Sequence, residues 1–185
     1  MAVRTRVAVM VGLAILVGIA AFHYGAAGHA AAPSIEITCV GGRHENPARL
    51  RGRPVLVTFW ATDCPACVRE MPSLTQLYKD YADRGLEIIG VATAWSRPDQ
   101  VYSIARAERL PYRIGLDLDG SAAAAFGDIE WTPTSFLIDP DGRIRYRKVG
   151  KLDIGKVRRL VASMLARTAV VPQTARTQDD QNALD

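Results

Sequence analysis

The chain has 185 residues, of which 49% are hydrophobic and 23% charged, and its formal net charge is +4 at pH 7. This composition is typical of a globular protein with enough apolar residues for one core plus extensions. The Lys and Arg residues are scattered rather than clustered, which argues against nucleic-acid binding. Three cysteines are too few for a disulfide-stabilised scaffold, and an odd number does not form a purely structural set.

An apolar run at residues 7–22 follows Arg4 and Arg6, and no Lys or Arg occurs again before Arg43. This asymmetry predicts that the N-terminus faces the cytoplasm and that the remainder lies across the membrane. The run is intermediate in length between a cleaved signal peptide and a membrane anchor, so residues 1–32 are interpreted as either one. Both interpretations place the rest of the chain in the bacterial periplasm, attached to the inner membrane if the segment is retained.

Hydrophobic periodicity predicts strands and helices that alternate along residues 34–167. Strands are expected at residues 34–40, 54–60, 86–94, 112–118, 134–138 and 143–149, the last two joined by a hairpin turn at residues 139–142. Helices are expected at residues 64–81, 99–109, 121–126 and 153–167. Such alternation predicts one α/β domain with helices on both faces of a sheet. The polar composition of residues 168–185 predicts a disordered tail.

Cys64 and Cys67 directly follow the strand expected at residues 54–60. If a helix begins at Cys64, its unpaired N–H groups and its dipole favour a thiolate there. Pro65 suits the first helical position, and a spacing of three residues brings the two sulfurs within bridging reach. The pair therefore indicates a redox-active disulfide, in which Cys64 is the nucleophile and Cys67 resolves the mixed disulfide. A zinc site would need further ligands, and a structural disulfide across so short a loop would add little stability.

The segment PVLVTFWATDCPACVREMP resembles the active-site strand, turn and helix of thioredoxin-like proteins, most of all the exported TlpA/ResA group of disulfide reductases. The resemblance covers about residues 35–165. Pro72 matches the proline inside the family's helix, and WTPTSFLIDPDGRI matches the loop, strand and hairpin that carry the family's cis-proline at Pro133. The resemblance implies a thioredoxin-like fold with a mixed central sheet, helices on both faces and a βα insertion at about residues 95–118, preceded by the N-terminal hydrophobic segment.

The same resemblance implies what the chain does. It would reduce disulfides of exported proteins through the Cys64/Cys67 dithiol, with that redox-active disulfide in place of any cofactor or metal. Pro133, if cis, would lie beside the disulfide, and Thr132 would offer backbone hydrogen bonds to an extended substrate. Typical clients in this group are apocytochrome c or a metallochaperone, and electrons would come from a membrane electron donor protein.

Aromatic residues at predicted strand and loop ends are candidates for the edge of a substrate groove. Trp131 and Trp95 are expected at the same end of the sheet as the cysteines, and core packing is the alternative for each. Between the cysteines, Pro65 and Ala66 complete the motif, but this dipeptide does not decide the direction of electron flow.

Departures from the family pattern concern the proton chemistry. Thioredoxins carry a buried Asp two residues before the Trp of this strand, and Thr58 stands there in this chain, while residues 94–97 contain no carboxylate either. Asp63 next to the nucleophile would oppose thiolate formation. Glu130 is a candidate proton acceptor, with a solvated loop charge as the alternative. Cys39 is expected to be a small buried hydrophobic residue.

Other functions of the same fold stay open. An oxidant that installs disulfides would use the same two cysteines in the opposite direction. A thiol peroxidase is suggested only weakly by Thr62 two residues before Cys64. A copper-binding chaperone would usually have a wider cysteine spacing and a distal histidine, and no histidine occurs between Trp95 and Leu152.

Overall fold

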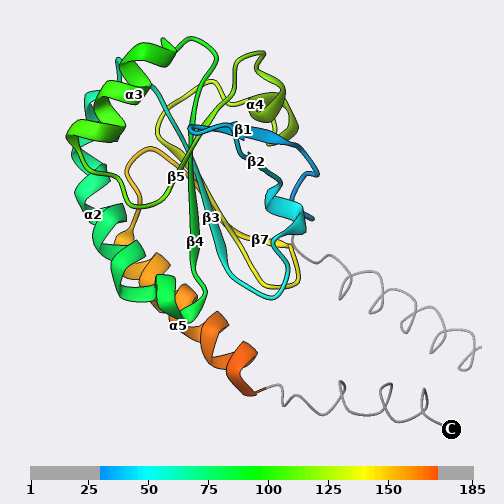
Figure 1. Ribbon diagram of the computed structural model, residues 1–185. Coiled ribbons are helices and arrows are strands. Elements are labelled where there is room, and N and C mark those ends of the chain that lie inside the picture. Colours follow the sequence, from blue (N-terminus) through cyan, green and yellow to red (C-terminus); the bar gives the residue numbers. More distant parts are fainter. Residues whose placement is uncertain (1–29, 171–185) are drawn as a thin grey trace, which may run out of the picture. The chain divides into compact units, whose positions relative to one another are not determined.

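The computed structural model describes residues 30–170, which form a seven-stranded sheet flanked by helices (Figure 1). The strands are β1 (Ile37–Cys39), β2 (His44–Glu45), β3 (Val55–Trp60), β4 (Glu87–Ala92), β5 (Arg113–Leu116), β6 (Thr134–Ile138) and β7 (Ile144–Val149). The α-helices are α2 (Pro65–Tyr81), α3 (Pro98–Ala107), α4 (Ser121–Ala125) and α5 (Ile154–Val170), and two short 3-10 helices are η1 (Pro47–Arg49) and η2 (Ala82–Arg84).

The sheet is mixed, as the resemblance implied. Its strand order is β2-β1-β5-β4-β3-β6-β7. β3, β4 and β5 run parallel to one another, and every other neighbouring pair is antiparallel. The expected βα insertion is present as α3 and β5, and β5 lies between β1 and β4 in the sheet.

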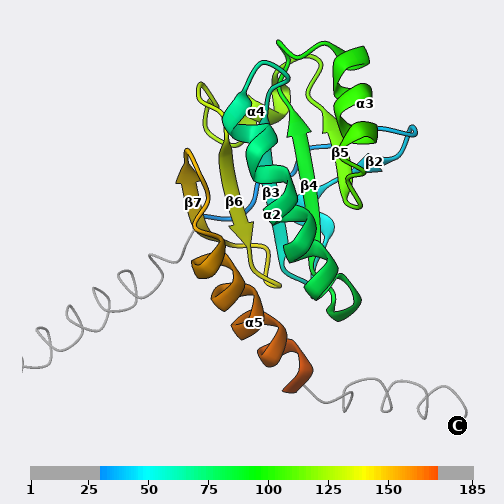
Figure 2. The same ribbon diagram turned by 90° about the vertical axis from the view of Figure 1, so that its left-hand side faces the viewer.

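Alternate residues of β3 build two separate cores, one on each face of the sheet. Leu56 and Trp60 pack with buried residues of α2, α3 and α5, while Val57 and Phe59 pack with Ala122 of α4 and its neighbours. Successive side chains of a strand point to opposite faces, so an unbroken apolar run is what a strand buried on both sides requires. Figures 1 and 2 show α2, α3 and α5 on one face and α4 on the other, which confirms helices on both faces.

Most of the expected elements are found, with shifts at their ends. The strand expected at residues 134–138 has those bounds as β6, whereas the strand expected at residues 34–40 is shortened at both ends to β1. After β1, Gly41 and Gly42 turn the chain with positive φ of 92° and 81°. The short β2 and η1 lie between residues 41 and 53, where no strand or helix was expected, since a two-residue strand leaves no periodic pattern. Pro72 lies inside α2, as expected, and its ring is exposed.

The two ends of the chain fall outside the described residues. α5 continues to Val170, past the helix end expected at Arg167. The divisions predicted at residues 32 and 168 stay predictions, because residues 1–29 and 171–185 are not described. Across residues 30–170, no helix has the length and hydropathy needed to cross a membrane.

A close approach of two strands gives the first testable prediction. A Cβ placed on Gly115 in β5 would overlap with Cγ2 of Ile37, which is buried in β1. The substitution Gly115→Ala should therefore lower the free energy of unfolding by about 1–3 kcal/mol, the usual cost of overpacking a core. Urea denaturation of the purified protein measures this.

The matched control is Gly155→Ala in α5, where the nearest atom to an added Cβ is Asp153 Oδ1 at 3.4 Å. A helical Gly→Ala change is expected to stabilise the protein by up to about 1 kcal/mol. Equal unfolding free energies for Gly115→Ala and the unmodified protein would contradict the packing of β1 against β5.

Candidate active site

The disulfide lies at the start of α2, just after the turn that follows β3. Cys64 and Cys67 are bonded, with their Cα atoms 5.3 Å apart. Cys64 is the N-cap residue of α2 and Pro65 stands at the first helical position. The Cys64 Sγ accepts a hydrogen bond from the backbone N–H of Cys67 at 3.1 Å. The same N–H also donates to the Cys64 carbonyl oxygen at 3.0 Å, so the sulfur shares one of the first N–H groups of the helix.

The two sulfurs differ in access to solvent. Cys64 is half-buried, whereas Cys67 is only 3% exposed. A molecule in solution can therefore reach the Cys64 sulfur more easily than the Cys67 sulfur. This arrangement fits a nucleophile and a resolving thiol, in the order that the helix position suggests.

The loop before β6 lies beside the disulfide. The Thr132–Pro133 peptide bond is cis, and Pro133 is buried. The Thr132 carbonyl oxygen lies 3.6 Å from Cys64 Sγ. The flanking carbonyls are both engaged, since the Thr134 hydroxyl donates to Trp131 O at 2.6 Å and Gly150 N donates to Pro133 O at 2.7 Å. The loop is thereby held with Thr132 facing the sulfur.

An open hollow surrounds the exposed side of Cys64. Trp95 and Trp131 both line it and are 52% and 71% exposed, so neither is a core residue. The hollow also contains Thr132, and Glu130 is exposed on its wall. Two exposed indole rings next to a reactive sulfur are an apolar surface that an unfolded client segment can cover.

The hollow has further walls from the start of α2 and the turn before it. These are formed by Asp63, Pro65, Ala66 and Arg69. The structure thus brings Pro65, Ala66, Trp131, Thr132 and Glu130 together around Cys64, while Pro133 faces Cys67 in a separate cavity.

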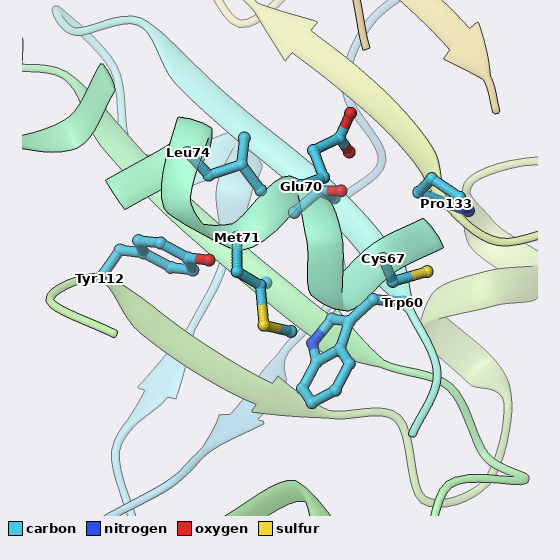
Figure 3. A pocket seen from close by; sticks show the side chains of 9 residues that line it. Trp60, Cys67, Glu70, Met71, Leu74, Tyr112 and Pro133 are labelled. Carbon is cyan, nitrogen blue, oxygen red and sulfur yellow. The ribbon is translucent and has the colours of Figure 1, made fainter. Parts of the chain in front are cut away.

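That inner cavity contains the one functional candidate that the sequence analysis missed. Glu70 lies one turn after Cys67 on α2, is 5% exposed, and lines the cavity together with Cys67 and Pro133 (Figure 3). Its Oε1 accepts a hydrogen bond from the backbone N–H of Leu152 at 2.6 Å. Burial raises the pKa of Glu70 above its ordinary value, and the Leu152 N–H and the nearby charge of Lys151 oppose that rise only in part.

The remaining cavity wall is largely apolar. Figure 3 shows Trp60, Met71, Leu74 and Tyr112 around the same space. The free space is about 10 Å³, close to the minimum that holds a single water molecule. The Trp60 Nε1 is buried without a partner among the described residues, and a water in this cavity would satisfy it.

Thr58 occupies the position where a thioredoxin would carry its buried Asp. Its hydroxyl is 2.9 Å from that of Ser135 on the neighbouring strand, and both residues are buried. The two hydroxyls satisfy each other, so this position holds a neutral hydrogen-bonded pair. The buried carboxylate of the site comes from α2 instead of β3.

Cys39 is buried in β1, as expected for a small hydrophobic residue, and it is not disulfide-bonded. Burial, followed by the charge of Glu45, raises the pKa of the Cys39 thiol to about 11. A thiol of such high pKa is almost entirely protonated at neutral pH and reacts slowly.

Comparison with known proteins places the chain in a family. Residues 26–163 match the Redoxin family. The thiol-disulfide oxidoreductase ResA of Bacillus thuringiensis subsp. konkukian is 33% identical over 113 residues, which cover 61% of this chain and 64% of that protein. ResA of Bacillus anthracis is 31% identical over 120 residues, covering 65% and 68%. The chain thus spans just under two thirds of the first relative.

A solved structure supports the same assignment. The thiol:disulfide interchange protein from Chlorobium tepidum, a thioredoxin family protein, superposes with a TM-score of 0.66 at 30% identity, covering 74% of this chain and 97% of that one. The chain therefore belongs to the Redoxin family and has the thioredoxin-like fold, with its Cys-x-x-Cys pair at Cys64 and Cys67.

Proposed function

We propose that this protein is a thiol–disulfide oxidoreductase that reduces disulfides of exported proteins. The observation that carries the proposal is the half-buried Cys64 at the N-terminus of α2, disulfide-bonded to a buried Cys67 and open to a hollow lined by Trp95 and Trp131. The ResA relatives are named thiol-disulfide oxidoreductases.

The reaction follows from the dithiol form. The Cys64 thiolate, held by the Cys67 N–H and the helix dipole, attacks a client disulfide and releases one client thiolate. Cys67 then loses its proton and attacks the Cys64 sulfur, which breaks the mixed disulfide. The second client thiolate leaves, the Cys64–Cys67 disulfide forms, and two electrons have passed to the client.

Glu70 is the best-placed base for the proton of Cys67. It lines the same cavity as Cys67, and burial raises its pKa, which makes it a stronger base than an ordinary carboxylate. Glu130, the candidate from the sequence, is exposed in the outer hollow beside Cys64 rather than in the inner cavity. The position of Thr132 beside Cys64 suits a backbone contact with an extended client.

The start of the sequence extends the proposal to location, and the family resemblance extends it to partners. The basic start and apolar run of residues 1–32 support an anchored or exported protein on the periplasmic side of the inner membrane. Apocytochrome c or a metallochaperone would be the client, and a membrane protein would return electrons to the disulfide.

The reverse direction, oxidation of client dithiols, uses the same atoms and is the second candidate. Direction depends on the reduction potential of the pair relative to its partners, about 30 mV for each 1.4 kcal/mol. A redox titration decides it. A midpoint near about −270 mV supports the reductant, and one near about −120 mV shows an oxidant.

The substitution Cys67→Ser should trap clients. Without a resolving thiol, the mixed disulfide on Cys64 persists, and mass spectrometry after acid quenching of cells identifies the attached proteins. The double variant Cys64→Ser/Cys67→Ser, which keeps Cys39, is the control and should trap nothing. Equal recovery of attached proteins with both variants would show that Cys64 is not the nucleophile.

The substitution Glu70→Gln should slow the resolving step by about 10-fold or more near neutral pH, because general-base assistance is lost. In the unmodified protein the rate of the resolving step should rise with pH as Glu70 loses its proton, at a pH above the ordinary range for Glu. The Glu70→Gln variant should not show this rise. Single-turnover reduction of a peptide disulfide, acid-quenched at several pH values, measures the mixed disulfide that accumulates.

Glu130→Gln is the matched control, because it makes the same change on the exposed carboxylate. If Glu130→Gln abolishes the rise with pH and Glu70→Gln does not, the assignment of the base is wrong.

The pH dependence of stability gives an independent check on Glu70. Burying a charge costs free energy, so the unmodified protein should lose stability relative to Glu70→Gln as pH increases from the ordinary pKa of Glu to the raised one.

A further inference from the structure

Charged side chains near Cys64 are left free by the fold. Asp63 and Glu130 line the hollow around Cys64, Arg69 lines it too, and Lys151 lines an adjoining hollow beside α5. All four side chains are exposed. Within residues 30–170, no salt bridge involves any of them. Their charges are therefore available to a bound molecule.

The two hollows adjoin each other on the surface. Ala66 and Arg69 line both of them. The second hollow continues over Ser73 of α2 to Leu152 and Ile154 at the start of α5. We call the two adjoining hollows together the client groove. It lies over the first turns of α2, and Cys64 lies in its first part.

The charge along the client groove changes sign. We call Asp63 and Glu130, which line only the hollow around Cys64, its acidic end. Its basic end is formed by Arg69, which lines both hollows, and Lys151, which lines only the second. Glu70 also lines the second hollow, but its Oε1 is occupied by the Leu152 N–H and its burial favours the neutral form. The exposed charge beyond Ala66 is therefore positive, and the exposed carboxylates lie on the side of Cys64.

We infer that the client groove selects client segments by the polarity of charge around the target cysteine. A preferred client carries basic residues on the side of its cysteine that meets Asp63 and Glu130, and acidic residues on the side that crosses Ala66 to Arg69 and Lys151. This inference rests on the proposed function, because it requires Cys64 to bond a client cysteine. It adds a specificity that the disulfide chemistry alone does not provide.

The size of the effect follows from ordinary surface electrostatics. Each exposed ion pair contributes little, typically a few-fold at most in an equilibrium constant. Several pairs acting together should give about a 5-fold preference at low salt. The charges are exposed, so the preference should shrink towards unity at about 1 M salt, where the Debye length is about 3 Å.

The test uses the Cys67→Ser variant of the whole chain and two peptides of identical composition. Each peptide has one central cysteine, bonded to 2-mercaptoethanol, with two Lys on one side and two Asp on the other, and the second peptide has the charges mirrored. Cys64 exchanges with the peptide disulfide and releases 2-mercaptoethanol, so electrons balance. Mass spectrometry gives the ratio of the two adducts in competition, a ratio that cancels changes in the reactivity of Cys64.

At low salt one peptide should exceed its mirror image by about 5-fold. The variant Arg69→Glu/Lys151→Glu should abolish or invert that preference, and Glu130→Lys should reduce it from the other end. The matched control Lys79→Glu changes a Lys near the far end of the same helix and should leave the ratio unchanged. Circular dichroism verifies that each variant is folded.

A ratio near one at low salt, or a preference that survives Arg69→Glu/Lys151→Glu, overturns the inference. A third peptide, with neutral residues around its cysteine, distinguishes a failure of charge selection from a failure of the disulfide exchange itself. If the neutral peptide forms an adduct and the charged pair shows no preference, only the charge selection fails. If no peptide forms an adduct at Cys64, the proposed function fails as well.

Discussion

The hydrogen bond from the Cys67 N–H to Cys64 Sγ, 3.1 Å long, is the contact on which the whole site depends. It exists because Cys64 caps α2 instead of belonging to its interior. A sulfur in that position replaces the side-chain oxygen that usually caps a helix, and it receives the positive end of the helix dipole. The same geometry leaves Cys67 inside the first turn and buried, so the helix start alone separates the two roles of the pair.

The topology of the sheet places the other parts of the site next to this helix start. β3 and β6 are antiparallel, with Phe59 opposite Thr134, so the end of β3 and the beginning of β6 share one edge of the sheet. The loop containing Pro133 is thereby brought to the disulfide. β4 runs parallel to β3 and ends at the same edge, which places Trp95 there too. Residues far apart in sequence meet because strand direction leaves no other arrangement.

The predictable and unpredictable parts of the site differ in the range of the contacts that create them. Cys64, Cys67 and the strand before them are local in sequence, and hydrophobic pattern and spacing were sufficient to find them. Glu70 lies on the same stripe of α2 as buried Met71 and Leu74, and a carboxylate on an apolar stripe was a signal that could have found it. Its partner, the Leu152 N–H, is 82 residues away, and no local pattern reveals such a contact.

The buried carboxylate of this site is on α2, whereas thioredoxins carry theirs on the strand that corresponds to β3. Thr58 lines the same inner cavity as Cys67, and its hydroxyl pairs with that of Ser135, so β3 adds no buried charge there. Glu70 instead lies between the inner cavity of Cys67 and the hollow lined by Lys151. The charge of Lys151 lowers the pKa that burial raises, so the proton affinity of Glu70 depends on a residue at the surface. A client acid that neutralised Lys151 would strengthen proton uptake by Glu70, because the opposing positive charge would be lost. Client binding and removal of the proton from Cys67 would then be coupled through one buried side chain.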